Sequence, residues 1–305
     1  MMNIKSFFEQ IFFSPRYYHT PFILLLLPLS LFYGMIMFFR RIFSKKRDFN
    51  IPIVSVGNLI VGGSGKTPFV IALSLKYENV TIVSRGYGRK SRGLVEVSVR
   101  GEILTTVEQS GDEAMLMALS LPNASVIVSE DRILAIEKAK RDGAKLIIMD
   151  DGFNRVEIKK FEVLLEPKEI KNYLPFPAGA FREFYFMRNY ADIIAREDED
   201  FEREVVIENP KEKMILATAI SNPQRLDKYL PQGVVYKYYL EDHAYFDEEV
   251  LMALLSKYQA TSVLCTSKDY VKMQGFKLEV SEMKLKFIIK EKILNKIDIY
   301  IKGYR

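Results

Sequence analysis

The feature that most constrains this chain is a glycine-rich segment, Gly57–Thr67, which directly follows the apolar run Ile51–Val56. The apolar run predicts a short buried strand, and the Gly-Lys-Thr at its far end predicts the start of a helix. Glycines let the backbone curl so that several N–H groups point at one anion, and a helix N-terminus adds its own unpaired N–H groups. The segment therefore predicts a phosphate-binding strand–loop–helix unit.

In a loop of this kind the lysine contacts the β- and γ-phosphates of a nucleoside triphosphate, and the hydroxyl after it binds Mg²⁺. We expect the nucleotide to be held by Gly62, Gly63, Ser64, Gly65, Lys66 and Thr67, with Thr67 also a metal ligand. The loop departs from the general pattern at Ile60, where that pattern has glycine. An ordinary strand–turn–helix corner is the alternative interpretation.

Strands and helices are expected to alternate from Ile51 to about Asp192, which predicts an α/β fold. The expected fold is a P-loop NTPase-like, mostly parallel sheet with helices on both faces. Strands are expected at 51–56, 80–84, 124–128, 145–149 and 161–165, helices at 67–77, 110–120 and 133–142, and a hairpin at 94–107. Ser110 and Glu113 are interpreted as a capping box for the second of these helices.

After about residue 192 the composition changes, and the charged run Arg196–Arg203 is a candidate linker. Further strands are expected at 214–219, 234–240 and 262–266, with a helix at 248–257. We therefore expect three parts: an N-terminal membrane-associating helical segment (1–47), a P-loop core (48–195) and a smaller second α/β domain (196–305).

The N-terminal segment contains no charged residue from Thr20 to Phe39 and is followed at once by a basic cluster, Arg40, Arg41, Lys45, Lys46 and Arg47. A helix of that length spans roughly 30 Å, the thickness of a bilayer core, and basic residues beside such a span mark its cytoplasmic side. A single transmembrane helix and a helical hairpin in the membrane interface, formed with Phe7–Phe13, remain alternatives. A buried helix of a soluble protein is the third.

Composition excludes several classes of protein. The 305-residue chain is 49% hydrophobic, as expected of a globular protein with a substantial core. Its single cysteine, Cys265, allows no disulfide within the chain, and one cysteine with two histidines shows no zinc-binding spacing. A formal net charge of +5 without a concentrated basic and aromatic face does not indicate nucleic-acid binding.

A second chemical signal is the apolar run Leu146–Met149, which ends in the two carboxylates Asp150 and Asp151. In phosphate-loop enzymes an aspartate in this place holds Mg²⁺ directly or through water. The carboxyl ends of parallel strands converge on one crevice, so this pair is expected near the phosphate loop. We assign Asp150 to the metal and Asp151 to the neighbourhood of the phosphate; an ordinary Asp-Asp-Gly turn is the alternative interpretation.

A series of short motifs follows in a specific order and spacing. They are Pro28–Gly34, Val56–Asn58, Val61–Pro68, Ser84–Tyr87, Gly111–Glu113, Glu130–Arg132, Asp150–Phe153, Pro177–Gly179, Arg182-Glu183, Asp242-His243 and Lys268-Asp269. In these motifs the sequence closely resembles the tetraacyldisaccharide 4'-kinases, the lipid A 4'-kinases of Gram-negative bacteria, over nearly the whole chain. The shifted glycine pattern of that family also accounts for Ile60.

The resemblance implies an ATP-dependent, Mg²⁺-requiring lipid kinase. Such an enzyme transfers the γ-phosphate of ATP to the 4'-hydroxyl of a tetraacylated glucosamine disaccharide 1-phosphate, at the cytoplasmic face of the bacterial inner membrane. The apolar N-terminus then has a purpose, because burying each CH₂ group is worth about 0.8 kcal/mol and keeps the acceptor in the bilayer. We expect a monomer. A membrane-tethered NTPase switch acting on a partner protein is the alternative.

The resemblance also implies residue roles. Asp112 is the first choice for the general base, with His243 as its partner, since a carboxylate–imidazole pair can take the hydroxyl proton. Arg132 and Arg182 are expected to stabilise phosphate charge, and Tyr87, Glu113 and Glu183 to line the sugar site.

Alternatives to these roles remain. Asp112 would also suit a helix N-terminus, and His243 a surface loop. The sequence does not decide which of Asp112, Asp150 and Asp151 is base and which binds metal, nor does it give the acyl-chain preference. The chain departs from the family at Asn154–Val156, where the family has Gln-His-Arg, and at Phe184, where it has proline.

Overall fold

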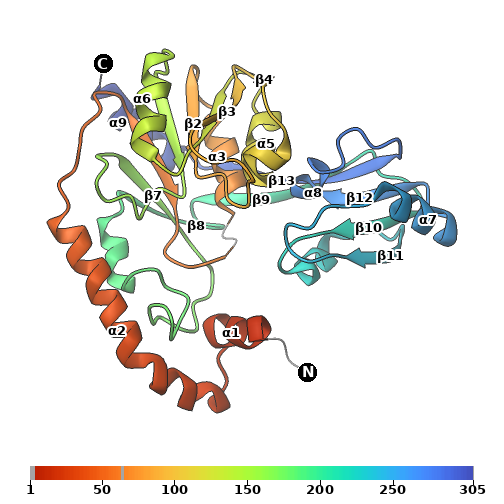
Figure 1. The fold of residues 1–305 in the computed structure, drawn as a ribbon, viewed down its shortest axis with the longest axis horizontal. Coiled ribbons are helices and arrows are strands. Elements are labelled where there is room, and N and C mark those ends of the chain that lie inside the picture. The colour runs from red at the N-terminus through yellow and green to blue at the C-terminus, as the bar shows by residue number, and fades with distance from the viewer. Residues whose placement is uncertain (1–3, 63–64, 305) are drawn as a thin grey trace. The chain divides into compact units, whose positions relative to one another are not determined.

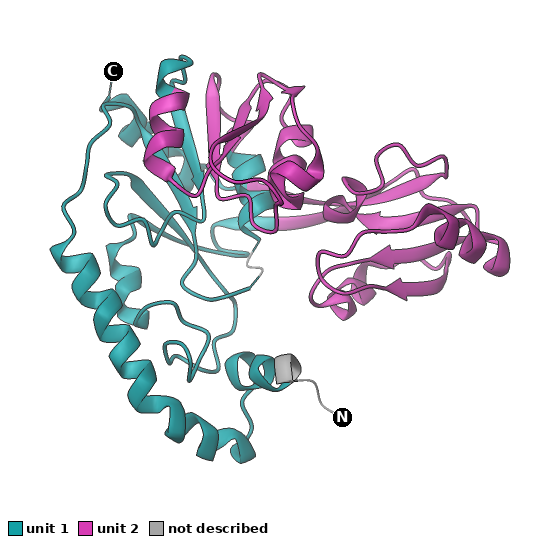
Figure 2. Cartoon of the chain, viewed as in Figure 1, with its two compact units in different colours: residues 1–73, 140–202, 289–305 teal, residues 74–139, 203–288 magenta. Residues whose placement is uncertain are grey.

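The computed structural model describes residues 4–62 and 65–304. The chain forms two compact units, each assembled from separated stretches (Figure 2). Unit 1 comprises residues 1–73, 140–202 and 289–305, and unit 2 comprises residues 74–139 and 203–288. The division into segments 1–47, 48–195 and 196–305 stays a prediction. The elements are labelled in Figure 1.

Unit 1 is built on parallel strands in the order β6-β1-β7-β8. They are β1 (Ile53–Gly57), β6 (Leu146–Asp150), β7 (Phe161–Glu166) and β8 (Ile193–Arg196). Every residue of β1 and β6 is buried, so the central strands are apolar rather than alternating, as expected of a covered parallel sheet. Helix α3 (Lys66–Ser74) follows the phosphate loop, and α9 (Glu291–Lys302) returns to this unit, where the Ile53 N–H donates to the Tyr300 hydroxyl.

Unit 2 contains two groups of strands. In the first, β2 (Val80–Ser84) pairs in parallel with β5 (Ser125–Val128), which pairs antiparallel with β3 (Val95–Val99), and β4 (Glu102–Ile103) closes the predicted hairpin. Its helices are α4 (Val107–Ser110), α5 (Asp112–Ser120) and α6 (Arg132–Arg141).

The second group is a sheet in the order β11-β10-β12-β13-β9. Its strands are β9 (Phe201–Glu208), β10 (Met214–Thr218), β11 (Val234–Tyr239), β12 (Ser262–Thr266) and β13 (Val280–Ile289), and its helices are α7 (Glu248–Tyr258) and α8 (Ser267–Tyr270). Ile215, Leu251 and Val263 lie in its core. The expected fold class, mostly parallel α/β sheets with helices, is confirmed.

The N-terminal segment of unit 1 forms α1 (Ile4–Phe13) and α2 (Thr20–Phe43). Among the described residues, one helical stretch, Tyr17–Phe43, is long and apolar enough to cross a membrane. One side of α2 lies on the rest of unit 1, because the Ser30 hydroxyl donates to the Pro175 carbonyl at 2.6 Å and Gly34 faces the Phe184 ring. The loop around the unexpected Phe184 is thus packed against α2. The other side of α2 exposes large apolar side chains.

One expectation about local structure is wrong. Ser110 does not cap α5: it ends α4, its hydroxyl donates to the Thr106 carbonyl at 2.9 Å, and Gly111 at φ 85° is the N-cap. The run 196–203 joins the end of β8 at Arg196 to the start of β9 at Phe201, and the boundary between the two units falls within it. Its role as a linker stays a prediction.

The β3–β4 turn leaves no room for a side chain at Gly101. Its φ is +85°, and a Cβ there would lie 2.0 Å from the Pro122 carbonyl oxygen. Gly101→Ala is expected to lower the free energy of unfolding by about 1–3 kcal/mol more than Gly93→Ala, which has φ +73° and open space. Chemical denaturation of the two variants measures the difference. Equal losses would show that the turn moves away from the carbonyl freely.

Candidate functional site

The phosphate loop of unit 1 joins β1 to α3. Gly62 at φ 100° and Gly65 at φ 81° adopt conformations that favour glycine, as the sequence predicted for a curled anion-binding loop. Gly63 and Ser64 lie outside the described residues. Ile60 forms an isolated antiparallel bridge with Phe181, and the Val61 N–H donates to the Ala180 carbonyl at 2.9 Å. The first half of the loop is therefore held by strand-like pairing, which suits isoleucine better than glycine.

Lys66, the first residue of α3, reaches two groups of unit 1. Its Nζ donates to Asn58 Oδ1 at 3.1 Å and lies 3.7 Å from Asp151 Oδ1. Arg182 binds the same Asp151 carboxylate through both oxygens, at 2.8 and 3.0 Å. Two cations thus surround one carboxylate, an arrangement with a surplus of positive charge that suits a polyphosphate. Thr67 follows Lys66 in the first turn of the helix.

Asp150 and Asp151 differ in backbone geometry and burial. Asp150 is the last residue of β6, lies opposite Val56 in the sheet and is 3% exposed. Asp151 adopts φ 52°, and its N–H donates to the Val56 carbonyl, so the chain turns sharply just after the strand. The buried Asp150 carboxylate and the partly exposed Asp151 carboxylate therefore lie in different surroundings, and their separate roles stay predictions.

The donor chemistry at this edge fits Mg²⁺. A carboxylate oxygen from Asp150 and a hydroxyl oxygen from Thr67 are hard ligands of the kind that Mg²⁺ prefers. Among the described residues no cluster of three or more His, Cys, Asp or Glu side chains forms a metal cage. Kinase sites bind Mg²⁺ through one or two protein oxygens and complete the shell with phosphates and water, so a small protein donor set is what such a site needs.

Arg41, near the end of α2, binds the two loops that carry Asp151 and Arg182. Its guanidinium contacts both oxygens of Glu183 at 2.8 Å and donates to the Phe153 carbonyl at 2.9 Å. The same group lies 4.2 Å from the centre of the Phe153 ring. Glu183 is 1% exposed. Its carboxylate is committed to Arg41, and its place in the sugar site stays a prediction.

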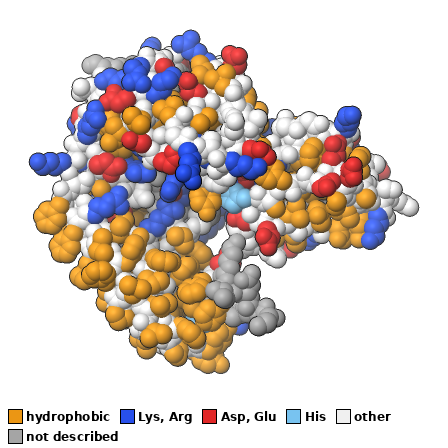
Figure 3. All heavy atoms as spheres, in the orientation of Figure 1, with side chains coloured by type: hydrophobic (Ala, Val, Ile, Leu, Met, Phe, Trp, Pro, Cys, Tyr) orange, Lys and Arg blue, Asp and Glu red, His pale blue; other side chains and the backbone are white. Residues whose placement is uncertain are grey.

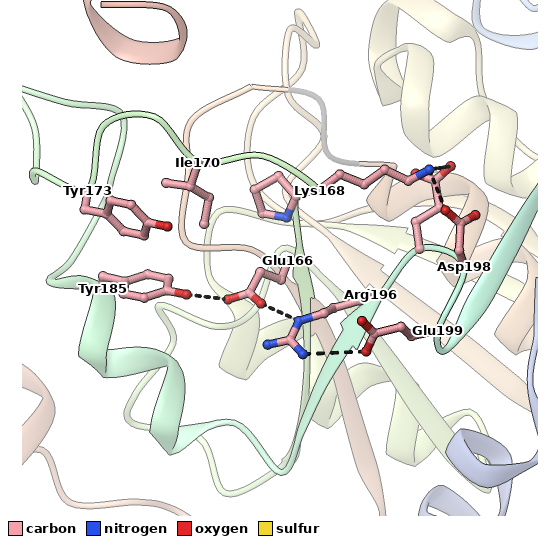
Figure 4. Close-up of a pocket in the computed structure, with 10 residues that line it drawn as sticks. Glu166, Lys168, Ile170, Tyr173, Tyr185, Arg196, Asp198 and Glu199 are labelled. Atoms are coloured by element: carbon pink, nitrogen blue, oxygen red, sulfur yellow. Dashed lines mark hydrogen bonds and ion pairs between the residues drawn. The ribbon is translucent and has the colours of Figure 1, made fainter.

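A cavity of about 250 Å³ lies among Glu166, Pro167, Lys168, Ile170, Tyr173, Tyr185 and Arg196–Glu199 (Figure 4). The Tyr185 hydroxyl and Arg196 Nε donate to the two oxygens of Glu166, at 3.0 and 2.7 Å. Burial raises the pKa of Glu166, but the hydrogen bonds from Arg196, Arg188 and Tyr185 lower it overall. This network joins the carboxyl ends of β7 and β8, and of the predicted site residues that the structure describes, none lines the cavity.

In unit 2 the structure brings together the predicted base and its partner. Asp112, the first residue of α5, is 5% exposed, and its Oδ2 lies 3.0 Å from His243 Nδ1. His243 adopts φ 67° in the loop after β11, and its N–H donates to the Ala219 carbonyl. The Tyr87 ring centre lies 5.5 Å from that of His243. Three residues far apart in sequence thus form one cluster.

Sequence reasoning missed the lysine that completes this cluster. Lys272 Nζ lies 3.1 Å from Asp112 Oδ2 and 3.8 Å from Asp269 Oδ1. Burial raises the pKa of Asp112, but the hydrogen bond from His243 and the charge of Lys272 lower it overall. The sequence feature that could have indicated a buried Lys272 is its position within the apolar stretch Tyr270–Met273. Lys268, interpreted only as part of a weak motif, lies 3.4 Å from both His243 Nε2 and Asp242 Oδ1.

The remaining predicted residues of unit 2 lie at its strand ends and helix starts. Arg132 begins α6, is 3% exposed and donates to the Ser129 carbonyl. Glu113 is half-buried in the first turn of α5, and Tyr87 is largely exposed. Their roles in phosphate and sugar binding stay predictions.

Comparison with known proteins gives consistent matches. The sequence model of a family described as tetraacyldisaccharide-1-P 4'-kinase matches residues 22–214 and 197–301. Proteins named tetraacyldisaccharide 4'-kinase are similar over almost the whole chain. The protein of Helicobacter pylori strain HPAG1 is 48% identical over 100% of this chain and 97% of its own, and that of Campylobacter jejuni strain 81116 is 42% identical over 99% and 98%.

A solved structure is also similar. It is the crystal structure of the "apo" form of LpxK from Aquifex aeolicus in complex with ATP, with a TM-score of 0.77 and 30% sequence identity. The match covers 92% of this chain and 99% of that one.

The Arg41–Glu183 pair has a measurable structural role. Glu183→Ala would leave a guanidinium with a side chain only 7% exposed and without its carboxylate, so unfolding is expected to become easier by about 3–5 kcal/mol. Asp48→Ala is the matched control, because its partner Lys159 is half exposed, and its cost is expected to stay below about 1 kcal/mol. Denaturant titration in mild detergent compares the two, and similar costs would contradict a structural role for Glu183.

Proposed function

This chain belongs to the tetraacyldisaccharide-1-P 4'-kinase family, and we propose that it transfers the γ-phosphate of ATP to the 4'-hydroxyl of a tetraacylated glucosamine disaccharide 1-phosphate. The observation that carries the proposal is the whole-length similarity to named lipid kinases. The positive φ angles of Gly62 and Gly65 and the 3.0 Å contact between Asp112 and His243 support it. The enzyme is thus a phosphotransferase of lipid A biosynthesis.

The phosphate-binding part of the reaction is assigned to unit 1. The loop N–H groups and Lys66 bind the β- and γ-phosphates, and Arg182 adds positive charge beside Asp151. Thr67 and Asp150 would hold Mg²⁺, which when bound neutralises charge on the phosphate oxygens. Phosphoryl transfer requires mainly positioning and charge stabilisation, and these residues supply both.

The proton-accepting part is assigned to unit 2. Asp112 takes the proton from the attacking hydroxyl, and His243 holds the carboxylate in place and shares the proton. Arg132 stabilises phosphate charge, and Tyr87 and Glu113 contact the sugar. Asp112 is a better base than metal ligand, because the positive charge of Lys272, 3.1 Å from its Oδ2, would repel a bound cation.

Membrane binding is assigned to α2. Its exposed side chains recur every three or four residues at Leu25, Leu29, Phe32, Ile36, Phe39 and Phe43, which makes one continuous apolar stripe (Figure 3). The middle of the helix, at Ser30 and Gly34, lies on unit 1 itself, and a helix crossing a bilayer would need that length free. We therefore propose that α2 lies in the interface on the cytoplasmic face of the inner membrane. A monomeric state stays a prediction.

Transfer of labelled γ-phosphate from ATP to the tetraacyl disaccharide 1-phosphate tests the chemistry. Lys66→Ala and Asp112→Ala are expected to reduce transfer by about 10²-fold or more, because each removes a group that acts on the reacting atoms. Lys76→Ala, an exposed lysine just after α3, is the control and is expected to retain wild-type transfer. Near-normal turnover of Asp112→Ala across pH would remove it as the base.

Flotation with phosphatidylethanolamine–phosphatidylglycerol vesicles tests the stripe. Leu25→Glu with Phe32→Glu is expected to weaken binding by tenfold or more, since burial of each such apolar side chain contributes about 1.5–3 kcal/mol. Val235→Glu, an exposed apolar residue of β11, is the matched control. Unchanged flotation of the double variant would contradict anchoring by α2.

Labelling of Tyr17→Cys with a membrane-impermeant maleimide separates the two membrane topologies. Tyr17 is 88% exposed at the start of the apolar stretch, and the native Cys265 is buried. The interfacial arrangement predicts labelling from the cytoplasmic side, whereas a spanning helix predicts labelling from the opposite side.

A further inference from the structure

The side chain of Lys272 is fully enclosed in unit 2, with none of its surface exposed. An enclosed ammonium group is costly unless its donors and charge are matched. Here Nζ has three partners: Asp112 Oδ2 at 3.1 Å, Asp269 Oδ1 at 3.8 Å and the Ala244 carbonyl at 3.2 Å. Ala244 follows His243 directly, so this one group contacts the base, the loop that carries its partner and a buried carboxylate.

Asp269 holds the Lys272 ammonium group in a fixed position. The Asp269 side chain is also completely enclosed, and the hydroxyls of Thr218 and Thr266 donate to its Oδ2 at 2.6 and 2.7 Å. The Ala219 N–H donates to its Oδ1 at 3.1 Å. Because Asp269 is anchored to the ends of β10 and β12, Lys272 is held in a set position rather than free to follow Asp112.

The polar contacts of the Asp112 side chain fall on one of its two carboxylate oxygens. His243 Nδ1 and Lys272 Nζ both reach Oδ2, at 3.0 and 3.1 Å. Within the described residues no hydrogen bond or ion pair of Asp112 falls on Oδ1. Of the two carboxylate oxygens, Oδ1 is therefore the one with lone pairs left for an incoming proton.

We propose that Lys272 is a positioning residue for the general base: it holds Asp112 by Oδ2, keeps it ionised and directs Oδ1 toward the acceptor hydroxyl. This inference rests on the proposed role of Asp112. The attacking O–H bond breaks, its proton goes to Oδ1, and Lys272 keeps its own protons throughout. Lys272 acts through Asp112 and touches no reacting atom.

Other charged and titratable groups lie around Asp112 and its partners. Lys268 of α8 and Tyr245 of the loop after β11 interact with Asp112 itself. Asp242 pairs with His243 and Lys268, Tyr87 lies beside His243, Asp269 beside Lys272, and Glu108 of α4 acts on Tyr245. Burial of Asp112 raises its pKa, and His243, Lys272 and Lys268 lower it. Removal of Lys272 takes away one of the interactions that lower the pKa of Asp112, so this pKa must rise. At low pH more of the Asp112 carboxyl is then protonated, and protonated Asp112 cannot act as base.

The pH profile of phosphate transfer by Lys272→Met tests the proposal. Relative to wild type, its kcat is expected to fall about tenfold more at pH 6 than at pH 9, with little change in KM for ATP. Lys272→Gln keeps a hydrogen-bond donor without the charge, and its kcat is expected to show the same additional loss at low pH. Lys286→Met, on the exposed side of β13, controls for loss of a positive charge and is expected to keep the wild-type profile.

The outcomes separate this inference from the proposed function. A wild-type profile in a folded Lys272→Gln variant overturns the positioning role, even if Asp112→Ala has lost transfer. Thermal unfolding establishes whether each variant folds, and if neither neutral variant folds, Lys272 serves stability instead and the proposal is likewise overturned. Full transfer by Asp112→Ala would instead overturn the base itself.

Discussion

Parallel pairing of β1 with β6 is the constraint on which the phosphate site of unit 1 depends. The register sets Val56 opposite Asp150, so the start of the phosphate loop and the two carboxylates emerge at the same edge of the sheet. The Asp151 N–H then donates to the Val56 carbonyl and turns the chain. From that turn the Asp151 side chain meets Lys66 and Arg182. Each later contact of the site follows from one backbone register.

Helix α2 serves two environments at once. Its inward residues are small or polar and bind unit 1, as Ser30, Gly34 and Arg41 show. Its outward residues are large and apolar, an unusual face for a helix in water. Since Arg41 also binds the loops that carry Asp151 and Arg182, the proposed membrane anchor and the phosphate-binding residues are parts of one packed structure.

Unit 2 shows how buried charge can organise a site. Asp112, Asp269 and Lys272 are each almost or fully enclosed, which is tolerable only because they partner one another and nearby hydrogen-bond donors. His243 joins the same cluster from a strained left-handed backbone position.

The sequence by itself determined the features that depend on neighbouring residues. The turn glycines Gly62 and Gly65, the strand ending at Asp150 and the apolar helix all follow from local patterns, and the structure has each of them. Local patterns were insufficient at Ser110, where the residue that polarity offered as a helix cap ends α4 instead.

Only the tertiary structure decided which distant residues meet. Asp112 and His243 are 131 positions apart, and their pairing was expected from family resemblance rather than from any local pattern. The commitment of Glu183 to Arg41 and the return of α9 to β1 had no local signal, and the apolar neighbours of Lys272 did not show which carboxylates it would bind. Such contacts depend on sheet order and chain crossing, and these are properties of the whole folded chain that no short window of sequence contains.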